Sequence, residues 1–185
     1  MHESGGSESE AVAPSAVSDV SVPSGLGFDA FYENHRDDVG RCLAMTLGDA
    51  ALGFDAADEA MARAYQRWDQ IRSGPNPSGW VYRTGLNWAR SWLRRRRRSS
   101  EKAPLLARPD SHTPHLVDTD LADALDLLSD DHRAVVVLRY FYDWSVDQTA
   151  EALDISAGTV KSRLSRALDQ LNKRLADGAE RGSRR

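Results

Sequence analysis

The chain has 185 residues, of which 41% are hydrophobic, and a formal net charge of −4 at pH 7. That length suffices for one ordinary domain or two small ones, and no apolar run reaches about 18 residues, which excludes a membrane-spanning helix and any membrane insertion. Cys42 is the only cysteine, so a disulfide within the chain and a zinc site of several cysteines are excluded, as suits the reducing cytoplasm.

The N-terminal segment, residues 1–26, is rich in Gly, Ser, Glu and Pro. It begins MHESGGSESE, with neither the basic start nor the apolar block of a signal peptide. Such a composition buries too little apolar surface to offset the entropy of ordering, so we expect a disordered tail.

Charge is unevenly distributed along the chain. Residues 83–98 carry Arg83, Arg90 and the run Arg94 to Arg98 without a single acid, whereas residues 118–131 contain six aspartates. The last forty residues are basic again. This segregation predicts separate surfaces for separate partners.

The first block, residues 27–98, shows three helical patterns. Apolar residues recur at spacings of three and four over 28–49 and again over 55–68, and the breaker RSGPNPSG occupies 72–79. A third helix is expected over 80–98. Its predicted inner stripe is Val81, Thr84, Gly85, Trp88 and Trp92, and a different stripe holds Trp80, Arg83, Asn87, Arg90 and Arg94.

The second block, residues 118–176, predicts four helices. Residues 99–117 contain three prolines and no periodicity, which is typical of a linker, so we expect the two blocks to pack weakly on each other. The helices are expected over 119–128, 129–144, 145–153 and 156–175, with Ser129, Ser145 and Ser156 as N-caps. Residues 177–185 are expected to be a disordered tail. No strand pattern competes, so the fold class is all-α, with two small helical domains.

The stretch 146–168 has the pattern of a helix-turn-helix, whose second helix reads DNA. Its expected apolar anchors are Ala150, Leu153, Ile155, Val160 and Leu164. Asp154 stands at the turn, and aspartate tolerates the left-handed conformation better than most residues. Polar residues, among them Thr159, Lys161, Ser162 and Arg166, are left to meet bases or phosphates. The alternative is a helical hairpin with a solvated basic face.

The arginine run has two interpretations. It continues a helix that carries Trp80, Trp88 and Trp92, and basic residues interleaved with aromatic ones suit exposed single-stranded bases. The alternative is a solvated basic face above a tryptophan core; Trp68 and Trp88 are expected in the core.

The two blocks together resemble a bacterial RNA polymerase sigma factor of the extracytoplasmic-function (ECF) group of the sigma-70 family. The resemblance rests on FDAFYENH, DEAMARAYQRW, WVYRTGLNWARSWLRRRRR and RAVVVLRYFYDWSVDQTAEALDISAGTVKSRLSRAL, in that order. It implies that the first block, sigma region 2, binds core RNA polymerase and opens the minus-ten promoter element. The second block, sigma region 4, would bind the minus-thirty-five element as duplex. An anti-sigma factor is a further candidate partner.

The resemblance also implies roles for particular residues. Core-polymerase binding falls to Asp55, Asp58, Glu59 and Arg63, and the loop 72–79 matches one that captures a flipped minus-ten base. Minus-ten binding falls to Trp80, Arg83, Asn87, Arg90 and Arg94. Minus-thirty-five binding falls to Thr159, Lys161, Ser162, Arg163 and Arg166.

We therefore expect a promoter-specificity subunit of the cytoplasm that is not an enzyme and has no catalytic residue, cofactor or metal. His112 and His115 have no further histidine or cysteine nearby in sequence, which argues against a metal site. One alternative, a one-component helix-turn-helix transcription regulator, leaves 27–98 unexplained. A second, an RNA-binding or nucleolytic enzyme, lacks paired carboxylates and a nucleophile–base set.

Overall fold

The computed structural model describes residues 27–100 and 119–182, and in those ranges it contains helices and no strand. The first block comprises α1 (Phe28–Leu47), α2 (Ala50–Gln66), α3 (Trp68–Ile71) and α4 (Pro77–Ser100). The second comprises α5 (Thr119–Asp126), α6 (Asp130–Tyr140), α7 (Val146–Leu153) and α8 (Ala157–Gly182). The all-α expectation is confirmed. The predicted N-terminal tail, nearly all of the predicted linker and the histidine pair lie outside the described residues.

Helices α1 and α2 form a tight antiparallel pair. Gly48 ends α1 in the left-handed conformation at φ 65°, and the Asp49 carboxylate then caps α2 by accepting from the Leu52 amide at 2.9 Å. A Cβ at Gly53 would lie 2.3 Å from the Ala44 amide nitrogen, so the close approach of the two helices requires glycine there. The pair buries Phe31, Leu43 and Met61, among others.

Helix α4 begins earlier than the sequence predicts, and its buried face is only partly the predicted one. It starts at Pro77, inside the expected breaker, because proline suits the first helical turn and the Asn76 side chain accepts from the Gly79 amide at 2.7 Å. Val81 and Gly85 of the predicted inner stripe are buried, but Trp88 and Trp92 are only partly so. The fully buried stripe also includes Tyr82, Leu86 and Ala89, which the sequence analysis missed.

The second block follows its local signals closely. Ser129 caps α6, and Ser145 forms a capping box with Gln148 at the start of α7. Asp154 adopts the left-handed conformation at φ 57° between α7 and α8, which confirms the predicted turn. Helix α6 ends at Tyr140, short of the predicted end, while α8 continues to Gly182 through a segment rich in the helix formers Ala, Arg and Glu.

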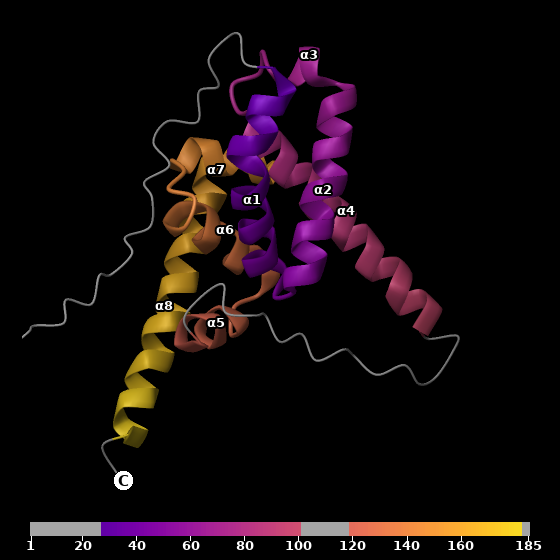
Figure 1. The fold of residues 1–185 in the computed structure, drawn as a ribbon. Coiled ribbons are helices and arrows are strands. Elements are labelled where there is room, and N and C mark those ends of the chain that lie inside the picture. Colours follow the sequence, from indigo (N-terminus) through magenta and orange to yellow (C-terminus); the bar gives the residue numbers. More distant parts are fainter. Residues whose placement is uncertain (1–26, 101–118, 183–185) are drawn as a thin grey trace, which may run out of the picture.

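The two blocks share one continuous hydrophobic core. Leu138, Tyr142 and Trp144 of the second block belong to the same buried cluster as Phe31 and Tyr82 of the first. The Tyr82 and Trp144 rings meet edge to face at 6.2 Å. Figure 1 shows α6 and α7 against α1, while the C-terminal halves of α4 and α8 extend beyond the bundle on different sides. The expectation of weak packing between the blocks is wrong in this conformation, because the buried aromatic side chains of 142–144 turn towards α4.

Candidate polymerase and promoter surfaces

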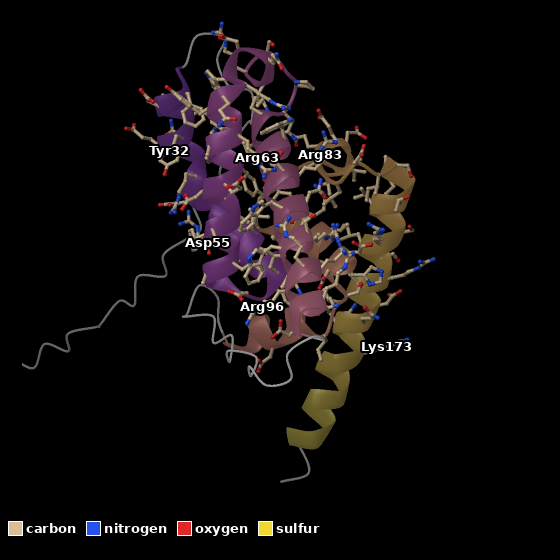
Figure 2. The ribbon with its side chains drawn as sticks, turned by 90° about the vertical axis from the view of Figure 1, so that its right-hand side faces the viewer. Tyr32, Asp55, Arg63, Arg83, Arg96 and Lys173 are labelled. Atoms are coloured by element: carbon tan, nitrogen blue, oxygen red, sulfur yellow. The ribbon has the colours of Figure 1, made fainter. Side chains whose placement is uncertain are left out.

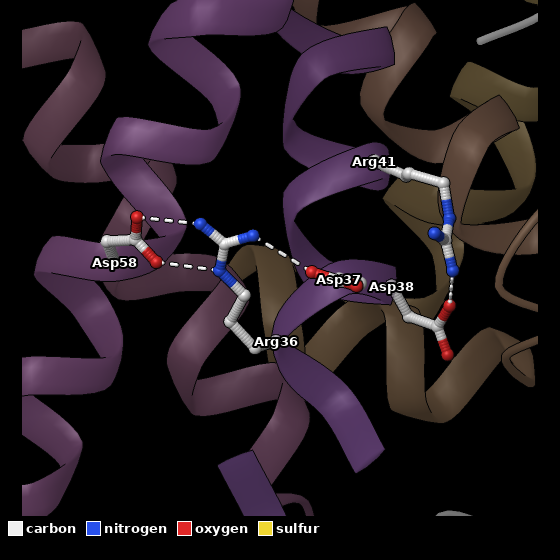
Figure 3. A network of polar contacts seen from close by, with 5 residues as sticks. All are labelled: Arg36, Asp37, Asp38, Arg41 and Asp58. Carbon is white, nitrogen blue, oxygen red and sulfur yellow. Dashed lines mark hydrogen bonds and ion pairs between the residues drawn. The ribbon is translucent and has the colours of Figure 1, made fainter. Parts of the chain in front are cut away.

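The acidic surface of α2 is partly occupied by α1. The Arg36 guanidinium on α1 binds Asp58 in bidentate fashion, with Nε and a terminal nitrogen each 2.7 Å from a carboxylate oxygen, and it also contacts Asp37 at 2.9 Å. These hydrogen bonds raise the pKa of Arg36 above its ordinary value. Figure 3 shows this network crossing from one helix to the other. Asp58 therefore has a structural partner that the sequence analysis missed.

The other residues predicted to bind polymerase differ in whether they form ion pairs. Asp55 is exposed and forms no ion pair among the described residues, whereas Glu59 pairs with Arg63 one turn on at 2.8 Å. Arg63 also lines a hollow on the α4 side of α2, away from Asp55 in Figure 2. Of the three acids in this set, Asp55 is thus the one without an ion-pair partner among the described residues.

An open hollow of about 470 Å³ lies between α2 and α4. Trp80, Thr84 and Asn87 of α4 line it together with Arg63 and Gln66 of α2 and with Arg67, which directly follows α2. We call it the α2–α4 hollow. It brings two predicted minus-ten residues, Trp80 and Asn87, to basic and amide groups at the C-terminal end of α2. Gln66 and Arg67 were not singled out from sequence, because their role depends on the packing of α2 against α4.

The loop before α4 is mixed in its exposure. Arg72 to Pro75 are exposed, whereas Asn76 and Ser78 are buried. A smaller hollow of about 210 Å³ joins this loop to Trp80 and to Glu151 of α7. The exposed part of the loop is therefore presented beside the α2–α4 hollow.

The remaining basic residues of α4 are not equivalent. Arg83 lies 3.6 Å from Asp154, Arg90 lies 2.9 Å from Asp131, and Arg94 donates to the Ser91 hydroxyl at 2.8 Å. Arg94 to Arg98 are all exposed. The Arg96 guanidinium lies over the Trp92 ring, 5.2 Å from its centroid, so Arg96 packs on an aromatic side chain of its own helix.

The helix-turn-helix presents most of the predicted minus-thirty-five residues at its surface. Val160 is fully buried, and the other predicted anchors, Ala150, Leu153, Ile155 and Leu164, are partly buried. Lys161, Ser162 and Arg166 are exposed, and the Ser156 hydroxyl caps α8 by accepting from the Thr159 amide at 3.1 Å. Arg163 is different: it is partly buried and binds Asp131 at 2.8 Å.

Two features are absent from the described residues. No helix in the ranges 27–100 and 119–182 is both long and apolar enough to cross a membrane. Over the same part of the chain, no three His, Cys, Asp or Glu side chains gather in a way that could hold a metal ion.

Comparison with known proteins places both blocks in one family. Region 2 of the sigma-70 family matches residues 31–99, and region 4 matches residues 118–171. The chain is 33% identical to the RNA polymerase sigma-E factor of Streptomyces coelicolor over 81% of this chain and 86% of that relative. It is also 33% identical to the ECF RNA polymerase sigma factor SigL of Mycobacterium tuberculosis, over 80% of this chain and 88% of that relative.

The fold agrees with solved sigma factors. The sigma factor RpoE of Bartonella quintana, solved in complex with the anti-sigma factor NepR, superimposes with a TM-score of 0.68 at 22% identity, covering 80% of this chain and 96% of that chain. The chain therefore belongs to the ECF group of the sigma-70 family. As a sigma factor it binds core RNA polymerase and directs transcription initiation at promoters; the one-component regulator is not favoured, since region 2 matches the first block.

Proposed function

We propose that three surfaces divide the work of initiation. The acidic face of α2, which includes the exposed Asp55, binds the clamp helices of the polymerase's largest subunit. The α2–α4 hollow and the basic face of α4 hold the opened minus-ten strand. The N-terminal half of α8 enters the major groove at the minus-thirty-five element. The observation that carries this division is that region 2 matches residues 31–99, which hold α2 and most of α4, and that region 4 matches residues 118–171, which hold the N-terminal half of α8.

The α2–α4 hollow supplies the chemistry that an unpaired base needs. Trp80 offers a stacking surface, Asn87 an amide for a base edge, and Arg63 and Arg67 cations for the strand. Flipping a base out of duplex costs a few kcal/mol, and stacking on an aromatic ring returns about 1–3 kcal/mol per base. Binding energy at this hollow is then of the size required to hold the strand open without catalysis.

The exposed part of α8 supplies the chemistry that duplex recognition needs. Lys161 and Arg166 offer cations to guanine edges or phosphates, and Ser162 and Thr159 offer hydroxyls to either. Small residues at positions 157 and 158 let the start of the helix approach the groove closely. Arg163 joins this surface once it is released from Asp131.

The chain contributes binding and no catalytic group of its own, because bond formation belongs to the polymerase. The protein functions in the cytoplasm, where the polymerase and promoter DNA are. An anti-sigma factor is a proposed regulator, by analogy with the solved relative that is bound to one.

The minus-ten assignment is tested by Asn87→Ala, with Asn172→Ala, an exposed amide late on α8, as the matched control. On duplex promoters with core polymerase, we expect Asn87→Ala to bind normally but to form fewer open complexes. A pre-melted template should rescue it only in part, because Asn87 is assigned to holding the strand as well as opening it. Equal open-complex formation by the two variants would contradict the assignment.

A further inference from the structure

Two side-chain amides line the α2–α4 hollow, one from each of its helices. Gln66 is the last residue of α2 and Asn87 lies near the middle of α4, and both are exposed to solvent. An amide side chain has a carbonyl oxygen that accepts a hydrogen bond and an NH2 group that donates two. Each helix therefore presents to the hollow a group that binds a donor and an acceptor lying side by side.

The α4 wall of the hollow also supplies a stacking surface. Residues 80, 84 and 87 are separated by four and three positions, so Trp80, Thr84 and Asn87 share one face of the helix. Trp80 is only partly buried, and an aromatic ring fixes the plane in which a stacked base lies. The Thr84 hydroxyl both donates and accepts, so it discriminates little between bases. The edges of a base stacked on Trp80 are then left to the two amides.

The two arginines of the hollow suit the backbone of the strand. The Arg63 guanidinium is held by Glu59 of the same helix at 2.8 Å. Arg67 is exposed and lines both this hollow and the smaller one beside the loop before α4. A cation between two hollows is placed for a phosphate that links two nucleotides, and phosphate contacts position a strand without reading its sequence.

The amide pair matches the hydrogen-bonding pattern of adenine. Of the two base edges that point away from the sugar, the Hoogsteen edge of adenine has the N6 amino group beside the acceptor N7, a pair that asparagine and glutamine bind in bidentate fashion. The Watson–Crick edge of adenine has the same amino group beside the acceptor N1. Guanine instead has two acceptors, O6 and N7, on its Hoogsteen edge, and cytosine and thymine carry a carbon, C5, there. Adenine alone therefore offers a donor beside an acceptor on both edges.

We propose that the α2–α4 hollow selects adenine at one position of the opened minus-ten strand. The base stacks on Trp80, and Gln66 and Asn87 each bind one of its two edges. Gln66 is then a specificity-determining residue, although no motif in the sequence assigned it a role. The inference rests on the proposed function, in which this hollow holds the opened strand. The rival outcome is selection of guanine by Arg67, because an arginine fork matches the two acceptors of guanine.

The test uses the full chain bound to core polymerase and a promoter identified by run-off transcription. The promoter is made as a fork, duplex upstream and single-stranded over the minus-ten element of the non-template strand. Each opened position is filled in turn with adenine, guanine, cytosine or thymine, and affinity is measured by competition. We expect one position at which adenine binds about fivefold to a hundredfold more tightly than each other base, the range of a bidentate contact.

Two variants and two base analogues separate the contacts to the two edges. Gln66→Ala and Asn87→Ala are compared with Gln170→Ala and Asn172→Ala, exposed amides late on α8. Each variant in the hollow should lose about fivefold or more of the preference for adenine, whereas the controls keep it. At the selected position, 7-deazaadenine lacks the N7 acceptor and 1-deazaadenine lacks the N1 acceptor. Each analogue should bind the unaltered chain more weakly than adenine does. In one of the two hollow variants it should bind as well as adenine, with a different variant for each analogue.

The outcomes distinguish the inference from the proposed function. A preference for guanine that Arg67→Ala removes would overturn the inference, as would a preference for adenine that neither Gln66→Ala nor Asn87→Ala reduces. Binding without any base preference that Trp80→Ala still weakens would also overturn it, because the hollow would hold the strand without reading it. Equal binding of every fork by Trp80→Ala and the unaltered chain would instead overturn the proposed function of the hollow, and with it the inference.

Discussion

Asp55 and Asp58 are close neighbours on α2, yet their surroundings differ. Asp55 is exposed without an ion pair in the described structure, whereas Asp58 forms an ion pair with Arg36 of α1. The Asp58 side chain keeps 50% of its exposure, so this pair contributes modestly to stability, about 1 kcal/mol or less. A charge change at Asp55 therefore probes polymerase binding, whereas one at Asp58 also probes folding.

The first prediction compares these two acids. Asp55→Lys should weaken binding to core polymerase and leave the melting temperature unchanged. Asp58→Lys should weaken binding and also lower the free energy of unfolding by about 1 kcal/mol, because the lysine faces Arg36. Affinity for core polymerase and thermal unfolding are the two measurements. The control for the change in net charge is Glu33→Lys, at an exposed position on α1. Unchanged core affinity in Asp55→Lys would remove α2 from the interface.

The second prediction concerns the exposed cations of α8. Arg166→Ala should cost about 1–3 kcal/mol and relax preference at one base pair, if a bidentate guanine contact is lost. Lys161→Ala should weaken binding more evenly across sequences and reduce the salt slope by about one unit. Both are measured as binding of the core-bound protein to minus-thirty-five variants over a salt series. Binding untouched by alanine at both positions would refute the role of α8.

The two halves of helix α4 have different surroundings. Its first half is built into the core through Val81, Tyr82 and Leu86, and its second half projects from the bundle with the arginine run (Figure 1). Adjacent helical residues differ by about 100° in direction, so five consecutive arginines cannot share one surface. Arg96 lies over Trp92, whereas Arg90 and Arg94 continue the face of Asn87.

The third prediction follows from this division. Arg90→Ala and Arg94→Ala should impair open-complex formation on duplex promoters, whereas Arg96→Ala should change it little. The measurement is the rate of open-complex formation with core polymerase at fixed salt. Equal, small and purely salt-dependent effects at all three positions would favour a nonspecific basic tail.

Local signals explain why most helices were predictable. Ser129, Ser145 and Asp154 act through residues a few positions away, so the sequence contains the whole interaction. The buried stripe of α4 was not predictable in the same way, because Tyr82 faces Trp144 of the other block. Likewise, the family resemblance implied DNA-binding roles for Arg90 and Arg163, but the sequence did not identify Asp131 as their shared partner, since that contact depends on tertiary packing.

At the scale of the whole molecule, the continuous core implies that the blocks associate without a covalent connection. The fourth prediction uses a protease site placed within 101–117 of the full chain. After cleavage the two fragments should co-elute on gel filtration at low salt, because Tyr142 and Trp144 pack among residues of the first block. Urea should separate them. Separate elution under native conditions would show that the blocks pack weakly, as composition alone suggests.

The central claim, that this chain confers promoter-specific initiation on core polymerase, is tested most directly by run-off transcription from genomic fragments. Core polymerase freed of other sigma factors is supplied with the purified chain. We expect discrete transcripts that depend on the chain, whose start sites share a two-part upstream sequence and are lost when either part is altered. Duplex binding without core polymerase, together with no initiation in its presence, would contradict the claim.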